Sequence, residues 1–589
     1  MTNPLSFYNQ EKEILEEKLS KLKKQLYTIS SLRLLVFLIT VFSVYFFFGE
    51  ITLVAICAFV GIVLFGLLLV KNAALQIRKQ ILVEKIKINS IEISVLQGNF
   101  DSLDSGKEFV DANHFFSNDI DLFGERSFYQ YSNRTATKEG AALYAKQLTE
   151  NSITNIEEKQ KAIQELSSKV HWRQHFSAIA SLVKVEVSSQ TIIKYIKDYK
   201  EVLPNYNRVL ITIFPFTSLV FIGLVSFGLL PFSYLVAWFF MGLFITGTQV
   251  KKTSKIYNQS GKAKETFKQY YKLLEEIEKT NFTTSILKEQ QQKVRSENEK
   301  ASVVFYKFSK ILDSFDQRNN VLIALVGNAF FLWDIQNAYK VEKWISKYKN
   351  IVENWFDVIT FFDAQNTLAN FHFNHPIFVF PVLLKEKAVV KATKLGHPLL
   401  NSEKRVDNDF EINKEQFYIV TGANMAGKST FLRTVSLTIV MANLGLPVCA
   451  EQFEYAPIKL ITSMRTSDSL ADDESYFYSE LKRLKFIVDQ IADEDYFIVL
   501  DEILKGTNSK DKAIGSKKFV EKLNASKSTG IIATHDVSLC VLEQENESIE
   551  NYFFDAEIHN DELHFDYTLK KGICKNMNAS FLLKKMKIV

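Results

Sequence analysis

The stretch TGANMAGKST, residues 421–430, has the residue types and spacing of a phosphate-binding loop, G-x-x-x-x-G-K-S. Gly422 and Gly427 allow backbone N–H groups to turn toward phosphates, and a helix starting at Lys428 adds the positive end of its dipole. Lys428 reaches the β- and γ-phosphates, and the Ser429 hydroxyl binds Mg²⁺. The loop therefore predicts an ATP site with Mg²⁺ as a second cofactor. Its predicted ATP-binding residues are Gly422, Ala423, Asn424, Met425, Ala426, Gly427, Lys428, Ser429 and Thr430.

Two later segments supply the acidic and imidazole groups that hydrolysis needs. The run YFIVLDE, residues 496–502, ends in adjacent acids, which are costly at a buried strand end unless a cation or catalysis uses them. Asp501 is expected to hold Mg²⁺ through water, and Glu502 to orient or activate the attacking water. The run GIIATHD, residues 530–536, is expected to lie beside it as a second strand. His535 at its end is a candidate sensor of the γ-phosphate or of the water.

The elements around these motifs predict an α/β domain at the C-terminal end. From about Ala388 onward, short apolar runs alternate with helical segments, the pattern of a parallel sheet covered by helices. The stretch from 252 to 360 contains no proline, so long helices dominate there. The expected fold class is a P-loop (ABC-type) α/β ATPase domain preceded by an all-α region.

Four apolar runs interrupt the upstream part of the chain: residues 34–49, 51–70, 209–230 and 232–250. A run of about 20 apolar residues crosses a bilayer core. Basic residues flank the outer ends of both pairs, which predicts two transmembrane hairpins with their ends in the cytoplasm. The alternative, buried helices of a soluble core, is disfavoured because runs this long and free of charge are rare in soluble proteins.

The motifs together resemble the MutS family. The resemblance is strongest after residue 391 and is carried there by TGANMAGKSTFLRT, DEILKGTNSKD, ATHD, GHPLL, DDESYFYSEL and HFDYTLKKG. A further match lies in residues 116–148, where the order F-G-E-x-S-F, N-R-T-x-T-x-x-G and L is similar to the start of the family's core, or lever, region.

The resemblance implies an ATPase that works as a homodimer, with two ATPs shared across the subunit interface. Ser475 matches the signature serine, which reaches the γ-phosphate in the opposite subunit. Tyr567 matches one aromatic position that contacts adenine, and the second such position falls near Arg405 or Val406, where no aromatic ring is present.

The expected organisation departs from that of mismatch-repair members. It comprises an amphipathic helix (1–30), a transmembrane hairpin (31–72), a linker helix (73–100), a core-like helical region (101–207), a second hairpin (208–251), a helical lever region (252–390) and the ATPase domain (391–589). The first 100 residues leave no room for a mismatch-reading domain, and the second hairpin lies about where repair enzymes insert their DNA clamp.

Two functions from different classes follow. One is a multi-pass ATPase of the cytoplasmic membrane, with its ATPase domain in the cytoplasm, that binds DNA in mismatch repair or recombination, including branched or non-mismatched DNA. The other is a mechanical membrane ATPase that acts on its hairpins, or on a membrane or repair partner, without DNA. The net charge of 71 − 67 = +4 favours neither strongly, since the lysines are not clustered. A transporter is disfavoured because the apolar runs lack charged residues. The scattered cysteines and histidines predict neither disulfides nor a structural zinc.

Overall fold

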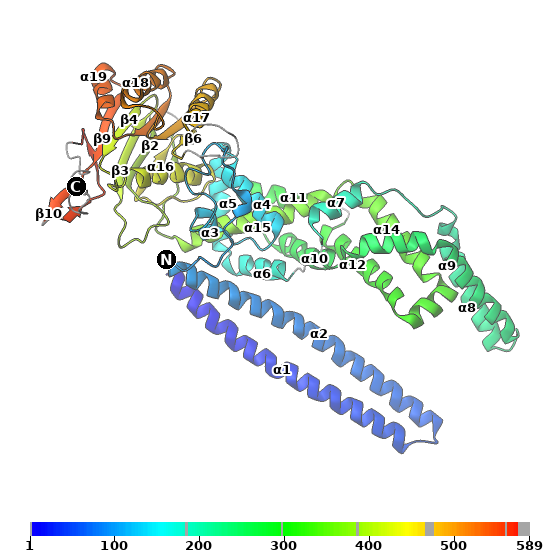
Figure 1. The fold of residues 1–589 in the computed structure, drawn as a ribbon. Coiled ribbons are helices and arrows are strands. Elements are labelled where there is room, and N and C mark those ends of the chain that lie inside the picture. The colour runs from blue at the N-terminus through cyan, green and yellow to red at the C-terminus, as the bar shows by residue number, and fades with distance from the viewer. Residues whose placement is uncertain are drawn as a thin grey trace.

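The computed structural model describes residues 3–182, 187–295, 299–384, 388–465, 476–559 and 562–574. The molecule is elongated: an α/β domain at one end is joined to a long helical body, and a separate pair of very long helices projects beside the body (Figure 1). The mostly helical architecture with a C-terminal α/β region agrees with the expected fold class.

The first two helices form one long antiparallel hairpin. They are α1 (Pro4–Phe46) and α2 (Ile51–Leu96). The amphipathic helix and the linker helix expected from the sequence are therefore not separate elements, because each continues without a break into the adjacent apolar run. Thr40 packs against Gly61, where an added Cβ would lie 2.2 Å from the threonine hydroxyl oxygen, so the two helices approach closely.

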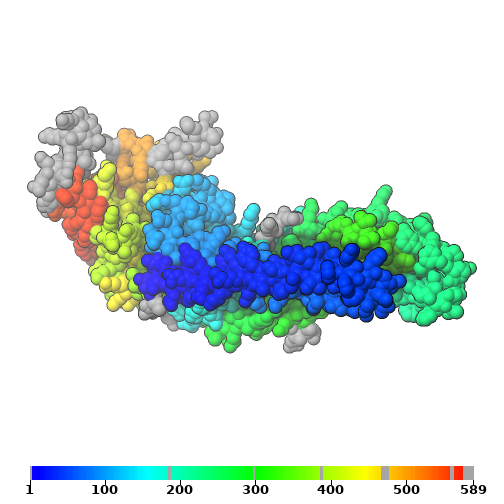
Figure 2. Space-filling view, turned by 90° about the horizontal axis from the view of Figure 1, so that it is seen from below, coloured from blue at the N-terminus to red at the C-terminus, as the bar shows by residue number. Residues whose placement is uncertain are grey.

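A buried polar network fixes the base of this hairpin to the helical body. The carboxylate of Glu92 on α2 accepts hydrogen bonds from Arg134, Asn370 and Asn374 at 2.6, 3.0 and 2.7 Å. The Tyr8 hydroxyl on α1 donates to Asn374 at 2.8 Å. From this base, the hairpin of α1 and α2 projects obliquely beside the body, with its tip toward the end opposite the α/β domain (Figures 1 and 2).

The helical body is built from longer helices joined by short helical turns. They are η1 (Lys107–Phe109), α3 (Phe128–Ser132), α4 (Lys138–Thr149), α5 (Ile156–Ser168), α6 (Val170–Ser181), α7 (Ser189–Lys197), α10 (Lys264–Lys279), α11 (Ser285–Val294), α12 (Ala301–Asp316), η2 (Gln317–Asn319), η3 (Ile323–Gly327), α13 (Asn328–Phe331), α14 (Trp333–Tyr348) and α15 (Val352–Asn374). On α10, the apolar face formed by Phe267, Tyr270, Leu274 and Ile277 is buried. These side chains and those of α12, α14 and α15 form one core that is rich in aromatic residues.

The second hairpin lies at the end of the body remote from the α/β domain (Figure 1). It consists of α8 (Asn207–Ser226) and α9 (Phe232–Gly261), with Pro231 as the N-cap of α9. Among the described residues, α1, α2, α8 and α9 are long and apolar enough to cross a membrane by length and composition. Only 6%, 6%, 11% and 17% of their most apolar windows is buried, so these segments are not the core helices of the alternative reading.

The α/β domain contains two larger sheets and a small hairpin. Its strands are β1 (Val382–Leu383), β2 (Ala388–Leu395), β3 (Asn408–Asn413), β4 (Phe417–Gly422), β5 (Gln452–Tyr455), β6 (Lys459–Ser463), β7 (Tyr496–Asp501), β8 (Thr529–Ala533), β9 (Ile549–Phe554), β10 (Glu557–His559), β11 (Glu562–His564) and β12 (Leu569–Lys571). Its helices are α16 (Lys428–Asn443), α17 (Tyr476–Gln490), α18 (Ser509–Ala525), η4 (Val537–Val541) and α19 (Leu542–Glu545).

The six-stranded sheet positions the site. Its order is β12-β9-β4-β8-β7-β6, and every pair is parallel except β12 with β9. β8 lies between β4 and β7, so the expected pairing of β8 with β7 is confirmed. The buried β-branched and aromatic residues of the three strands match the fully covered strands of an α/β sheet. Their carboxyl ends therefore meet at one edge.

Candidate functional site

A strand, a glycine-bounded loop and a helix start form the centre of the candidate site. β4 ends at Gly422, whose φ of 147° and closeness to the Phe554 carbonyl exclude a side chain: an added Cβ would lie 2.6 Å from that oxygen. Gly427 has φ 105° and is the N-cap of α16, so the helix starts without a capping side chain. The first turn of α16 thus has backbone N–H groups that are available to an anion.

Lys428 is buried beside the loop. Its ammonium group donates to the carbonyl oxygens of Gly422 and Ala423 at 2.8 and 2.9 Å. Burial lowers the pKa of Lys428, which the nearby Asp501 and Glu502 oppose. A buried ammonium held only by neutral carbonyls is incompletely compensated, so this position fits a phosphate group.

Ser429 and Asp501 join the helix start to the end of β7. The hydroxyl of Ser429 donates to the Asp501 carboxylate at 2.6 Å. A hydroxyl and a carboxylate oxygen are the hard ligands that Mg²⁺ prefers, and Mg²⁺ usually keeps several waters besides. These two residues are placed to hold a magnesium ion.

Glu502 and His535 lie next to this pair. The nearest oxygen of Glu502 is 3.6 Å from Nε2 of His535, and its other oxygen is 3.9 Å from the ammonium of Lys505. Glu502 has φ 53°, a strained backbone for this residue type, and its N–H donates to the Ala533 carbonyl at 2.9 Å. Burial and, next, the charge of Lys428 lower the pKa of His535, which favours the neutral imidazole.

These groups line a cavity of about 810 Å³, large enough for a nucleotide. Of the predicted site residues, the lining includes Ala423, Asn424, Met425, Gly427, Lys428, Ser429, Thr430, Asp501, Glu502, His535 and Tyr567. Gly422 lies behind the loop, where its carbonyl holds Lys428, and Ala426 is fully buried. Ser475 lies outside the described residues.

Tyr567 reaches the cavity from a loop before β12. Asn408 fixes this loop, since its amide donates to the Tyr567 carbonyl at 3.1 Å and its side-chain oxygen accepts from the Leu569 N–H at 2.7 Å. The ring lies against Gly427, where an added Cβ would be 3.1 Å from it. The positions near Arg405 and Val406 also line the cavity, so both expected adenine-contact regions are in the same cavity.

Three further lining residues, Lys404, Lys505 and His397, are not among those predicted from the sequence. Lys505 follows Glu502 by three residues, within KGTNSKD, and His397 lies in GHPLL. For Lys505 and His397, the available signal was their position within motifs that carry the family resemblance; Lys404 lies in no such motif. Lys505 adds a second cation near Glu502, which would balance the negative charge of a bound polyphosphate.

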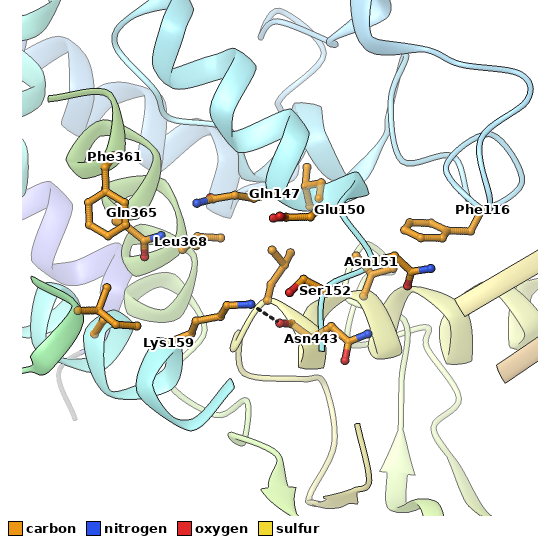
Figure 3. Close-up of a pocket in the computed structure, with 15 residues that line it drawn as sticks. Phe116, Gln147, Glu150, Asn151, Ser152, Lys159, Phe361, Gln365, Leu368 and Asn443 are labelled. Carbon is orange, nitrogen blue, oxygen red and sulfur yellow. Dashed lines mark hydrogen bonds between the residues drawn. The ribbon is translucent and has the colours of Figure 1, made fainter. Parts of the chain in front are cut away.

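A second, smaller cavity of about 150 Å³ lies at the junction between the helical body and the far end of α16. Residues of α4, α5 and α15 face α16 across it (Figure 3). The ammonium of Lys159 on α5 donates to the carbonyl oxygen of Asn443, the last residue of α16, at 3.3 Å. α16 therefore contacts the larger cavity at its start and the helical body at its end.

The C-terminal α/β region is similar in sequence to known proteins. Residues 418–586 match the family described as MutS domain V. The chain is 30% identical over 199 residues to MutS protein homolog 4 of Homo sapiens, which covers 32% of this chain and 21% of that protein. It is 32% identical over 203 residues to DNA mismatch repair protein MSH6 of Arabidopsis thaliana, covering 31% of this chain and 15% of the relative. The match thus spans about a fifth or less of these relatives.

Proposed function

This chain belongs to the MutS family through its C-terminal α/β region, and we propose that it is a membrane-anchored, Mg²⁺-dependent ATPase whose ATP cycle drives a conformational change in a homodimer. The observation that carries the proposal is the convergence of Lys428, Ser429, Asp501 and Glu502 on one cavity beside a helix start. In phosphoryl-transfer enzymes, groups of these kinds bind the phosphates, hold Mg²⁺ or position the attacking water.

The roles follow from position. Lys428 and the N–H groups of α16 would bind the phosphates, and Ser429 with Asp501 would hold the magnesium ion, which neutralises phosphate charge during transfer. Glu502 would accept a proton from, or orient, the attacking water. His535 stays neutral because its pKa is lowered, so it can donate one hydrogen bond and accept another near the γ-phosphate.

Dimerisation would complete the site. Ser475 is assigned to the γ-phosphate bound in the other subunit, which makes each nucleotide site composite. ATP would then stabilise the closed pair and hydrolysis would release it. The α16 connection from the loop to Lys159 supports a path by which that change reaches the helical body.

Membrane anchoring is supported by exposed apolar surface. Phe42, Phe46 and Phe48 near the tip of the first hairpin are 66–86% exposed, and Phe216 and Phe244 on the second are 69% and 74% exposed. Such a surface is unfavourable in water and matches acyl chains. Both hairpins extend toward the end of the molecule opposite the α/β domain, so one bilayer can accept both (Figure 1). We place the ATPase domain in the cytoplasm and the hairpins in the cytoplasmic membrane.

DNA is the ligand that family membership favours, in a repair or recombination context. The second candidate is a mechanical membrane ATPase that moves its hairpins or a partner protein without DNA. The position of α8 and α9 at the far tip of the helical body favours this alternative, since a membrane segment there would receive the largest displacement of a lever (Figure 1).

Salt-dependent binding separates the two. The full chain in detergent would be titrated with homoduplex, heteroduplex and branched DNA at rising salt. For DNA binding we expect a logarithmic affinity that falls linearly with salt, because phosphate contacts release counterions. No binding at about 50 mM salt, where such contacts are strong, would reject DNA and leave the mechanical function.

A further inference from the structure

An exposed apolar segment joins α12 to α14 beside the second hairpin, and no motif in the sequence accounts for it. It covers residues 320–332, reads NVLIALVGNAFFL and contains η3 and α13. Val321 and Leu322 are 79% and 72% exposed, and Leu325 and Val326 are each 45% exposed. Neighbouring apolar side chains exposed to this degree are disfavoured in water.

The segment packs against the middle of α9 rather than its cytoplasmic end. Gly242 touches the backbone of Ala329, where an added Cβ would lie 1.9 Å from the carbonyl oxygen. The rings of Phe239 and Phe330 are 5.7 Å apart. Leu332 joins Phe214 of α8 in a small shared core.

The depth of these contacts follows from helix geometry. Lys251, the first lysine of α9, follows Gly242 by nine residues and Phe239 by twelve. At about 1.5 Å per residue, the contacts lie about 13–18 Å from that lysine, roughly half the ~30 Å thickness of a bilayer core.

The segment starts at the level expected for the membrane surface. Arg318 donates to the Ser254 hydroxyl at 3.0 Å, and its guanidinium lies 5.0 Å from the centre of the Tyr257 ring. Both contacts are with residues of α9 that lie among or next to Lys251, Lys252 and Lys255. Arg318 also pairs with Asp334 at 3.1 Å, so each buried charge has a partner.

The irregular backbone within the segment has internal hydrogen-bond partners. Leu332 adopts the left-handed conformation with φ 50°, which breaks the helix between α13 and α14. Gln336 donates to the Phe331 carbonyl at 2.9 Å, and Asn328 accepts from the Asp334 N–H at 2.9 Å. Non-helical backbone is tolerated at membrane depth when protein groups satisfy it in this way.

We propose that residues 320–332 form a re-entrant membrane element that enters the bilayer beside α9 to about mid-depth and returns through α14, with Val321, Leu322, Leu325 and Val326 against lipid acyl chains. The inference rests on the proposed membrane function of α8 and α9. The occupant is lipid, because the exposed surface is continuous with the apolar hairpin on which the segment packs. The second hairpin then has a third membrane element packed on it, and this element belongs to the helical body itself. Movement of the helical body would therefore act directly on the bilayer.

Site-directed spin labels on the full chain test this in vesicles of phosphatidylethanolamine and phosphatidylglycerol. Single cysteines at Leu322 and Leu325, in a background without the four native cysteines, would be compared with Phe240 on α9 as a lipid-facing reference. Val303 on α12, 39% exposed, is the aqueous reference. Collision with oxygen reports lipid, and collision with a water-soluble nickel chelate reports solvent.

We expect labels at Leu322 and Leu325 to collide preferentially with oxygen, as at Phe240. Preferential collision with the nickel chelate, as at Val303, would overturn the re-entrant element and leave the hairpin intact. Protection from both reagents would also overturn it, because the surface would then be covered by protein such as a second copy. An aqueous signal at Phe240 itself would instead reject the membrane function on which the inference rests.

Discussion

The hydroxyl of Ser429 and the carboxylate of Asp501 are 2.6 Å apart although 72 residues separate them in the chain. The contact exists because β4 and β7 are separated only by β8 in a parallel sheet, so the loop after β4 and the end of β7 meet at one edge. Lys428 and Glu502, the neighbours of these two residues in sequence, are thereby brought to the same cavity.

This geometry predicts that replacing Lys428 weakens ATP binding, whereas replacing Glu502 slows ATP hydrolysis. Lys428→Ala removes the buried cation that faces the phosphates, so ATP affinity should fall by roughly 10- to 100-fold, the worth of one charged hydrogen bond. Glu502→Gln keeps the shape of the side chain but cannot accept a proton, so it should bind ATP normally and hydrolyse it about 10²-fold more slowly or worse. Nucleotide binding and phosphate release measure the two effects.

The matched control is Lys414→Ala. Lys414 is an exposed lysine before β4 that pairs with Asp495 at the opposite end of the sheet. Its substitution should change neither quantity. Turnover at the wild-type rate in both Lys428→Ala and Glu502→Gln would remove these residues from the mechanism.

The positions of the site elements could be predicted because the signals are local. A buried strand, two glycines at fixed spacing and a following helix define residues 416–430 without long-range information. The adjacency of β7 and β8 also followed from their shared pattern of apolar runs ending in polar residues. The roles assigned to the site residues remain predictions, and Ser475 lies outside the described residues.

Other features could not be predicted because the sequence does not encode them locally. The network around Glu92 and Tyr8 joins residues up to 366 positions apart, and no single motif signals such pairing. Residues 320–332 were missed for another reason: their apolar run is interrupted by Gly327 and Asn328 and is too short for the length criterion of a membrane span. Similarly, α1 and α2 continue past the apolar runs because their flanking charged residues are good helix formers.

The membrane topology predicts opposite labelling at the two ends of α9. Leu229 lies in the turn between α8 and α9 and is 69% exposed, whereas Lys255 lies beyond the apolar run. In a background without native cysteines, a membrane-impermeant maleimide should label Leu229→Cys in intact cells. It should label Lys255→Cys only after permeabilisation, and reaction of Lys255→Cys in intact cells would refute cytoplasmic ends.

Arg134 is expected to be essential for the hairpin base. Its Nε lies 2.6 Å from Glu92, and these side chains are 13% and 1% exposed. Arg134→Met would leave the Glu92 carboxylate buried without its cation and should lower the free energy of unfolding by about 3–5 kcal/mol. Lys107→Met removes the exposed pair with Glu125 and should cost at most about 1 kcal/mol. Equal losses in the two variants, measured by denaturant unfolding, would contradict the assigned importance of the network.

Lys159 should fasten the end of α16 to the helical body. Its ammonium faces the last carbonyls of that helix, where the helix dipole favours a cation by roughly 0.3–1 kcal/mol. Lys159→Met should therefore speed amide hydrogen exchange in the last turn of α16 several-fold. Lys161→Met on the same helix α5 is the control, because Lys161 pairs with the exposed side chains of Glu157 and Glu158 and not with α16 in the described part of the chain. Unchanged exchange in Lys159→Met would show that packing alone holds the junction.

His375 predicts a loss of stability in mild acid. Its Nδ1 donates to the Phe371 carbonyl at 2.8 Å, so Nε2 of the neutral ring accepts from the Tyr131 hydroxyl at 2.7 Å. Burial lowers the pKa of His375 to about 4, below its value of about 6.5 in an unfolded chain. The unfolded state therefore binds more protons between these pH values, so the stability present above pH ~6.5 is lost as the pH falls toward about 4.

Replacing this histidine should flatten that dependence. His375→Gln keeps a polar side chain that does not titrate, so its unfolding midpoint should change less between pH 7 and pH 5 than that of the wild type. His171→Gln, at a histidine whose side chain is 66% exposed, should leave the wild-type slope unchanged. Thermal unfolding of the detergent-solubilised chain measures all three proteins, and parallel curves for wild type and His375→Gln would show that other groups cause the acid sensitivity.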